Sequence, residues 1–524
     1  MIGDGLPGLW HPDEPTLVGL AARIAAGQPN PHFFNYPSLW MYALALCFGA
    51  QFLVGRLTGS VASVAAFEAA YFVDPSPWFL TGRVASALLG AATVPLTHRL
   101  ATRLGAGRLA WLAATCLALA PLHIGSSRLL VTDAPLTFAT TLALLGILRY
   151  AREPARWPAW RAGLVAGLAV SIKYTAAALA IPLLMAAHAA DPARRLRDRI
   201  IALVAAAAGF LVGTPFAILA PREFLGGVLA ELTHARTGHF GGDPAVVGYV
   251  HYLTSVLPEG LGLFALIAAL AGVVTLTARA IRAPSAPAPL LATYLLASFV
   301  VIGGSKIPFD RYCLPLLPPL LAFAAAFAAV ALPAAPRWRA LAAPVVAVLL
   351  LAGPASRTLD TLLRPDTRVL ADAWLAAHVP IQIPIAVELY GSAARPSPAQ
   401  YAEAIAAMSG APDLNADERR QLERWRRREG LVRTRPPSRP VFRLLDEAPA
   451  RMDFDRVPYD AAALDARRVG YVVLSEAMYG RYARAPERAA MPAALYEQLT
   501  RQGPPVATFP AHPPPSCRSP WRCA

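Results

Sequence analysis

Apolar runs dominate the middle of the chain, where they follow one another closely between residues 84 and 353 with short polar loops between them. A helix that crosses the roughly 30 Å hydrocarbon layer of a bilayer needs roughly 17 to 25 mostly apolar residues. Several of the runs are shorter than a full span, so half-spans or buried helices are the alternative for these. We predict about ten transmembrane helices, over residues 84–96, 109–123, 135–148, 163–172, 174–187, 200–216, 258–278, 289–302, 314–331 and 340–353.

The last third of the chain has a different pattern. Charged residues become frequent after residue 356, and a run rich in arginine occupies 417–429. Short β-rich runs at 385–390 and 469–475 alternate with a helical pattern at 369–378, which is typical of a small α/β domain.

These patterns divide the chain into three parts. We expect a first loop with juxtamembrane helices at 1–83, a multi-span helical domain at 84–355 and a soluble α/β domain at 356–524. The predicted fold class is therefore mainly α, a polytopic transmembrane helical fold with a small C-terminal domain. One further apolar run, 37–54, has both ends on the same predicted side, so we interpret it as a juxtamembrane or re-entrant helix.

Arginine content alternates from loop to loop. Cytoplasmic loops carry the excess of Lys and Arg, so the Arg-rich loops near residues 99–108, 149–161, 194–199, 279–282 and 337–339 are predicted to be cytoplasmic. The intervening loops and both ends of the chain then face away from the cytoplasm. This pattern predicts a multi-pass protein of the cell inner (plasma) membrane, with its functional groups on the periplasmic or extracytoplasmic face.

The start of the chain is unusual for an extracytoplasmic segment, because Met1-Ile2-Gly3 opens neither a signal peptide nor a span. We expect that a first transmembrane helix precedes this sequence, and a naturally short N-terminus is the alternative.

Composition agrees with a membrane protein. Hydrophobic residues make up 56% of the chain and charged residues 15%, which is far more apolar than a soluble domain. The formal net charge of +15 does not indicate nucleic-acid binding, because the arginine run contains a single aromatic residue, Trp425, and no series of interleaved aromatic residues. We interpret this run as a solvated helix face.

The predicted outward loops carry the candidate chemistry. Asp13 and Glu14 are adjacent and follow a proline close to the membrane face, where partial desolvation can make a carboxylate a usable base. A helix N-cap at Asp13 is a structural explanation that can hold at the same time. Candidate partners from the same side are His11, Tyr36, Arg83, His123, Arg128, Asp133, Lys173, Tyr174, His239, Lys306 and Arg311, while His251 and Asp310 lie on these loops without an assigned role.

Lysine is rare here. Of the 48 lysines and arginines only Lys173 and Lys306 are lysines, and both stand at predicted outward ends of spans. A compact ammonium suits the binding of a phosphate, whereas snorkelling of two chance lysines to the interface is the alternative.

Several short motifs occur in order along residues 5–355 and on one predicted side. They are Leu6-Pro7, His11-Pro12-Asp13-Glu14, Phe33-Phe34-Asn35-Tyr36-Pro37-Ser38-Leu39, Arg83, Ser86-Ala87-Leu88-Leu89-Gly90, Pro121-Leu122-His123, Thr132-Asp133-Ala134-Pro135-Leu136, Lys173-Tyr174-Thr175 and Phe309-Asp310-Arg311-Tyr312. In this order they resemble bacterial members of the GT-C superfamily. More narrowly, they resemble the family that includes dolichyl-phosphate-mannose protein mannosyltransferases and the lipid A aminoarabinose transferase.

The resemblance implies an integral-membrane glycosyltransferase that moves one mannose-like sugar from a polyprenyl-phosphate carrier to a protein, lipid or glycan acceptor, with inversion at the anomeric carbon. By the same resemblance Asp13 would take the acceptor's proton, Glu14 would support it and Asp133 would be a second acidic group. Beyond the lipid-linked donor no cofactor is expected, and no motif requires a divalent metal. Candidates to hold the carrier phosphate are Arg83, Arg128, Lys173, Lys306 and Arg311.

The chain departs from the aminoarabinose-transferase branch at one motif. That branch has Lys-Pro-Pro where this chain has Tyr36-Pro37-Ser38. The phosphate contact would then differ, which favours Lys173 or an arginine and argues against a lipid A acceptor. The later outward loop with Gly238 and His239 could close over the site, or could be a glycine-hinged structural turn.

Two other functions compete with this interpretation. A transporter or lipid-sugar flippase also has many spans, but it would place ionisable residues near mid-membrane and often shows inverted repeats, and the sequence shows neither pattern. An oligosaccharide-transferring or polymerising relative would have a further acidic metal-binding motif near the first loops, which the sequence also lacks.

Overall fold

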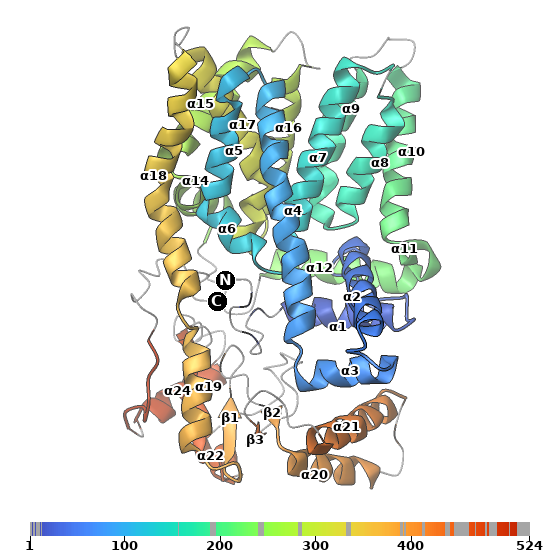
Figure 1. The fold of residues 1–524 in the computed structure, drawn as a ribbon, viewed down its shortest axis with the longest axis vertical. Helices are drawn as coiled ribbons and strands as arrows, with labels where there is room; N and C mark the ends of the chain where they lie inside the picture. Colours follow the sequence, from blue (N-terminus) through green and yellow to red (C-terminus); the bar gives the residue numbers. More distant parts are fainter. Residues whose placement is uncertain are drawn as a thin grey trace.

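The computed structural model describes residues 3, 6, 11, 13–155, 157–188, 195–238, 246–280, 286–331, 337–387, 391, 395–410, 414, 416–434, 441–444, 461–466, 468–476, 479–480, 490–501 and 503–510. Long helices run side by side through one half of the molecule, and shorter helices and a small sheet gather beyond one end of them (Figure 1).

Each predicted span coincides with a helix of this bundle. The helices are α4 (Ser76–Arg103), α5 (Ala110–Leu119) followed by α6 (Pro121–Ser127), α7 (Asp133–Arg152), α8 (Ala159–Val170), η2 (Tyr174–Leu179) followed by α9 (Ala180–His188), α10 (Arg195–Gly213), α15 (Leu263–Arg279), α16 (Pro287–Gly303), η4 (Asp310–Leu316) followed by α17 (Leu317–Ala331), and α18 (Arg337–Leu363). The end of the bundle where α4 and α7 begin and where α8 and α10 end is called the site end below.

Length and apolar composition alone support fewer spans than the sequence analysis predicted. Among the described residues four helices are long and apolar enough to cross a membrane, namely α2 (Leu39–Leu57), α4, α7 and η4 with α17. The number rises to six if each of two bent pairs, 107–119 with 121–127 and 248–261 with 263–279, forms one span. Helices α8 and α16 are apolar but short, and Arg195 and Asp198 lie at the start of α10.

Helix α2 passes this test, yet its contacts keep both of its ends at the site end. The Leu39 backbone N–H donates to the Ser171 carbonyl oxygen at the end of α8, at 3.0 Å. Further along α2, the Gln51 side chain accepts a hydrogen bond from Thr81 near the start of α4. These contacts fit the predicted juxtamembrane helix.

Helices α8 and α10 pack with their backbones in close approach. A Cβ added to Gly163 would collide with the Ala202 carbonyl oxygen, and one added to Gly167 would collide with that of Ala206. Small residues permit this approach where apolar packing against lipid gives no net hydrophobic gain. The two glycines therefore position the end of α8, from which the chain leads to Lys173.

Short helices cover the site end. In Figure 1, α1 (Asp13–Ala25), α3 (Val64–Val73) and α12 (Pro221–Thr237) run across the direction of the long helices. The chain reaches α12 through α11 (Phe216–Leu219) and returns to the bundle through α13 (Gly248–His251), η3 (Tyr252–Val256) and α14 (Leu257–Leu261).

The C-terminal domain lies beyond the same end (Figure 1). Its four strands are all parallel, in the order β2-β3-β1-β4, with bounds β1 (Pro384–Val387), β2 (Arg395–Pro396), β3 (Val441–Leu444) and β4 (Tyr471–Val473). The accompanying helices are α19 (Thr367–His378), α20 (Pro398–Ser409), α21 (Ala416–Thr434), α22 (Ala461–Ala466) and α24 (Ala490–Arg501). The predicted fold class, mainly α with a small α/β domain, is confirmed.

The structure adds two details to the predicted tail. Helix α18 continues to Leu363, so the predicted boundary at residue 356 falls inside a helix that extends past the bundle. The arginine run forms the largely exposed helix α21, which also contacts α3: Arg427 pairs with Glu68, and the Arg428 guanidinium lies 5.7 Å from the Phe72 ring centroid.

Candidate active site

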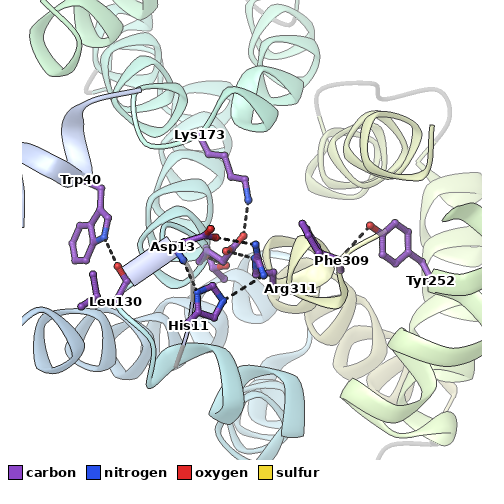
Figure 2. Close-up of polar contacts among 10 residues, drawn as sticks. His11, Asp13, Trp40, Leu130, Lys173, Tyr252, Phe309 and Arg311 are labelled. Atoms are coloured by element: carbon purple, nitrogen blue, oxygen red, sulfur yellow. Dashed lines mark hydrogen bonds and ion pairs between the residues drawn. The ribbon is translucent and has the colours of Figure 1, made fainter. Parts of the chain in front are cut away.

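Four charged residues from distant parts of the chain meet at the site end (Figure 2). Arg311, in the first turn of η4, places Nη2 3.0 Å from Asp13 Oδ2 and Nε 3.4 Å from Asp133 Oδ2. Lys173, between α8 and η2, donates from Nζ to Asp133 Oδ1 at 2.8 Å. The two carboxylates and two cations form one alternating chain of ion pairs, so their charges balance.

The accessible half of this chain is the pair at the first loop. The side chains of Asp13 and Arg311 are 27% and 20% exposed, whereas those of Asp133 and Lys173 are 2% and 8% exposed. A ligand from solvent or from the bilayer surface therefore meets Asp13 and Arg311 first, and the inner pair supports them.

Aromatic rings enclose the two cations. Lys173 Nζ lies 4.1 Å from the Tyr312 ring centroid and 5.9 Å from that of Tyr36, and the Arg311 guanidinium lies 4.3 Å from the Phe309 centroid. Such contacts favour a cation that has lost part of its hydration. Burial raises the pKa of Tyr36 well above its ordinary value, so Tyr36 remains a neutral phenol.

Glu14 and Arg83 form a separate, enclosed ion pair. Arg83 donates to both carboxylate oxygens of Glu14, at 2.9 and 2.6 Å, and the two side chains are 3% and 0% exposed. Arg83 was predicted as a phosphate-binding candidate from its predicted side of the membrane, but the structure places its guanidinium against Glu14 inside the protein.

The same ion pair holds the segment that leads to Asp133. The Leu130 backbone N–H donates to Glu14 Oε1 at 3.0 Å, and the Leu130 carbonyl oxygen accepts from Trp40 Nε1 at 3.0 Å (Figure 2). Both backbone polar groups of Leu130 are thus bound by first-loop side chains, which fixes where α7 begins and where Asp133 points.

The remaining predicted residues lie elsewhere. Tyr174 donates to the Phe34 carbonyl oxygen at 2.8 Å and thereby ties η2 to the first loop. His123 is buried on α6 next to Gly90 of α4, and Arg128 stands at the C-terminal end of α6. Lys306 has an exposed side chain, and its backbone N–H donates to the Ala235 carbonyl oxygen at 2.9 Å. His239 lies outside the described residues.

Two further contacts lie beside Arg311, and the sequence motifs assigned no role to their residues. His251 Nε2 lies 3.1 Å from Asp310 Oδ1, and Tyr252 donates to the Phe309 carbonyl oxygen at 3.3 Å. Tyr252 begins the π-helix η3, a rare geometry that is frequent at functional sites. The two contacts fix the backbone on the N-terminal side of Arg311. The only signal for them in the sequence is that both segments lie in loops predicted on the same side of the membrane.

No group of three or more His, Cys, Asp or Glu side chains in the part of the chain that the structure describes is arranged to hold a metal ion.

Part of the chain is similar to a known protein family. Residues 48–225 match the dolichyl-phosphate-mannose-protein mannosyltransferase family. This mannosyltransferase-family region contains Arg83, Asp133 and Lys173 and ends in the first part of α12, whereas Asp13 and Arg311 lie outside it. The match confirms the GT-C resemblance seen in the sequence motifs.

Solved structures show a distant similarity. The ArnT protein from Cupriavidus metallidurans bound to undecaprenyl phosphate is 15% identical, with a TM-score of 0.46 over 74% of this chain and 80% of that one. Its apo form gives 16% identity and a TM-score of 0.48, over 72% and 78%. The Archaeoglobus fulgidus oligosaccharyltransferase tethered with an acceptor peptide is 13% identical, with a TM-score of 0.44 over 74% of this chain and 60% of that one. No curated protein sequence matches the chain.

Proposed function

We propose that this protein is a membrane glycosyltransferase that moves a single sugar from a polyprenyl-phosphate carrier to an acceptor at the site end of the bundle. The observation that carries the proposal is the contact of Asp13 with Arg311, because it places a proton acceptor beside a cation in the accessible half of the site. The mannosyltransferase-family match supports a mannose-like sugar and a lipid-phosphate donor.

The reaction needs one base and one anion-stabilising group. An acceptor hydroxyl attacks the anomeric carbon, its proton passes to the Asp13 carboxylate, and the bond from that carbon to the phosphate oxygen breaks. The electron pair of that bond leaves with the polyprenyl phosphate, and direct displacement inverts the anomeric carbon. Arg311 meets the negative charge that develops on the phosphate, an electrostatic contribution that is usually the largest in such reactions.

The inner ion pair positions Arg311. Lys173 is enclosed by Asp133, Tyr36 and Tyr312, so its ammonium is less accessible to a lipid phosphate than the Arg311 guanidinium. Lys173 instead neutralises Asp133, and Asp133 in turn faces Arg311 Nε. In this proposal Arg311 is the phosphate contact, and Lys173 acts through Asp133.

The surroundings of the site suit a lipid-borne substrate. Helix α12 crosses the site end and exposes Leu225, Leu229 and Leu232 at spacings of four and three residues, which form one stripe of the helix. A transverse helix with such a stripe fits the bilayer interface. The carrier's polyprenyl chain would remain in the bilayer while its phosphate reaches Arg311.

The arginine pattern supports an extracytoplasmic location. Arg103, Arg152 and Arg279 stand at the last turns of α4, α7 and α15, at the end of the bundle opposite the site. Because cytoplasmic ends carry the Lys/Arg excess, the site end would face the periplasm or cell exterior of an inner (plasma) membrane.

A donor screen tests the proposal. The full-length protein in proteoliposomes would be supplied with radiolabelled polyprenyl-phosphate mannose, then with other polyprenyl-phosphate sugars, together with membrane extract as acceptor. We expect protein-dependent transfer of label and release of polyprenyl phosphate with at least one donor. Movement of the intact lipid-linked sugar across the bilayer without release of polyprenyl phosphate would contradict the proposal and favour a flippase.

A further inference from the structure

The hydrogen bonds of His11 fix the position of its ring proton. The Asp13 backbone N–H donates to His11 Nδ1 at 3.3 Å, so Nδ1 must present its lone pair. An imidazole with an unprotonated Nδ1 carries its proton on Nε2, and this assignment follows from the hydrogen-bond network. His11 is therefore an N–H donor at Nε2.

That donor faces a second donor. His11 Nε2 lies 3.5 Å from Arg311 Nη1, the contact drawn as a dashed line between them in Figure 2. A guanidinium nitrogen has hydrogens and no acceptor lone pair, so these two groups cannot hydrogen-bond to each other. They can both donate to one atom placed between or in front of them, and that atom must be an acceptor.

We infer that His11 Nε2–H and Arg311 Nη1–H together bind one non-bridging oxygen of the carrier phosphate. The inference rests on the proposed function for the identity of the phosphate, and it goes further by assigning His11 a specific atom and a specific partner. Each nitrogen of the Arg311 guanidinium then has its own direction: Nη2 is directed to Asp13, Nε faces Asp133 and Nη1 is directed toward His11.

An anion fits this pair better than a neutral hydroxyl. Arg311 already balances carboxylates through Nη2 and Nε, and the hydrogen bond from Nη1 to an anionic phosphate oxygen joins two opposite charges, which makes it stronger than one to a neutral hydroxyl. The neutral ring of His11 adds a second donor without a second full charge. Burial lowers the pKa of His11 below its ordinary value, which agrees with a neutral imidazole near pH 7.

The placement also suits the reaction. Nη1 and Nη2 belong to the same planar guanidinium, so a phosphate on one nitrogen and the Asp13 carboxylate on the other are held in a fixed relation. The sugar would lie beyond the phosphate, and its anomeric carbon would face the acceptor hydroxyl that Asp13 deprotonates.

Two substitutions at one position test the inference, because asparagine and glutamine replace different ring nitrogens. His11→Asn keeps an acceptor near the place of Nδ1 for the Asp13 N–H and removes the Nε2–H donor. His11→Gln puts an amide N–H near the place of Nε2. The probes are farnesyl phosphate and farnesol, which share the apolar chain and differ in the phosphate, and their binding to the detergent-solubilised full chain would be followed by tryptophan fluorescence.

We expect His11→Asn to weaken farnesyl phosphate binding by about 10- to 100-fold, the effect of one lost hydrogen bond to a charged group, while His11→Gln stays much closer to the unchanged protein. Farnesol binding should be the same in all three proteins. Unchanged farnesyl phosphate binding by His11→Asn, or an equal loss of farnesol binding, would overturn the inference.

Sugar transfer, measured separately, distinguishes this inference from the proposed function. If the farnesyl phosphate and farnesol results are as expected but no donor supports sugar transfer, the phosphate-oxygen site is supported and the proposed transferase function is refuted. In a protein that does transfer sugar, a rise in the donor KM for His11→Asn agrees with the inference, and a rise in the acceptor KM alone contradicts it.

Discussion

Arg311 Nη2 lies 3.0 Å from Asp13 Oδ2, although the two residues are 298 positions apart in the sequence. The contact joins the start of α1, in the first loop, to the start of η4. The candidate base and the candidate phosphate-binding cation therefore depend on two elements that the intervening helices must hold in register.

Removing one partner of the Glu14–Arg83 pair should destabilise the protein strongly. Glu14→Gln keeps the side-chain volume but leaves the buried Arg83 guanidinium without its counter-charge, a change that typically costs about 3 to 5 kcal/mol. Thermal unfolding in detergent should show a large fall in the midpoint. The double substitution Glu14→Met with Arg83→Met should be less harmful than the sum of the single changes, and simple additivity would argue against the ion pair.

The two lysines should differ sharply in their effect on transfer. Lys173→Met leaves Asp133 buried with only Arg311 as counter-charge, which should draw Arg311 inward and lower kcat by about 100-fold, corresponding to about 3 kcal/mol. Lys306→Met is the matched control, because the Lys306 side chain is exposed outside the ion-pair chain. We expect it to change transfer by less than about twofold. Equal losses from both variants would contradict the role assigned to Lys173.

Glycine-to-alanine substitutions in α8 and α12 should change the free energy of unfolding in different directions. Alanine is favoured over glycine in a helix by about 1 kcal/mol, so Gly226→Ala on α12, where a Cβ meets nothing within 4 Å, should be neutral or stabilising. Gly167→Ala should instead destabilise, because the added Cβ collides with the Ala206 carbonyl oxygen of α10. Unfolding midpoints of the two variants measured side by side would show this. A stabilising Gly167→Ala would disprove the close approach of α8 and α10.

The contact between α12 and the first loop should weaken in acid. Glu223 Oε2 lies 2.8 Å from His32 Nδ1 and accepts from Asn30 at 3.1 Å, and these hydrogen bonds lower the pKa of Glu223 below its ordinary value. A carboxyl whose folded pKa is lowered contributes stability above its unfolded pKa, and this is lost as pH falls through the folded value. The unfolding midpoint should exceed that of Glu223→Gln at pH 7. The difference should shrink as the pH falls through the lowered pKa of Glu223, and a difference that stays constant into the acid range would argue against the contact.

Much of the site was predictable because loops at one face of a membrane protein converge. Asp13, Asp133, Lys173 and Arg311 were grouped from the alternation of Arg-rich loops, and the structure brings all four together. The positions of the helices were predictable for a similar reason, since apolar segments in a membrane have few stable arrangements other than a helix.

Other features depend on how distant helices pack against each other, so no local sequence pattern predicts them. The pairing of Glu14 with Arg83 requires α1 to pack against α4 at one register, so the sequence could not separate Arg83 from the accessible cations. The π-helical turn that begins at Tyr252 and the docking of Arg428 on Phe72 are likewise products of packing. The length of an apolar run was also an unreliable guide to the helices of the bundle. Helix α8 is shorter than a full span, yet it packs closely against α10.

The most direct measurement is the transfer of radiolabelled sugar from an active polyprenyl-phosphate donor by the Asp13→Asn variant, compared with the unchanged protein at equal amounts in the membrane. Asparagine retains the size of the side chain and an oxygen that can accept from Arg311, but it is not an effective base at neutral pH. The account predicts that transfer falls by at least about 100-fold while the unfolding midpoint changes little. Transfer by Asp13→Asn at the rate of the unchanged protein would contradict the assignment of Asp13 as the base.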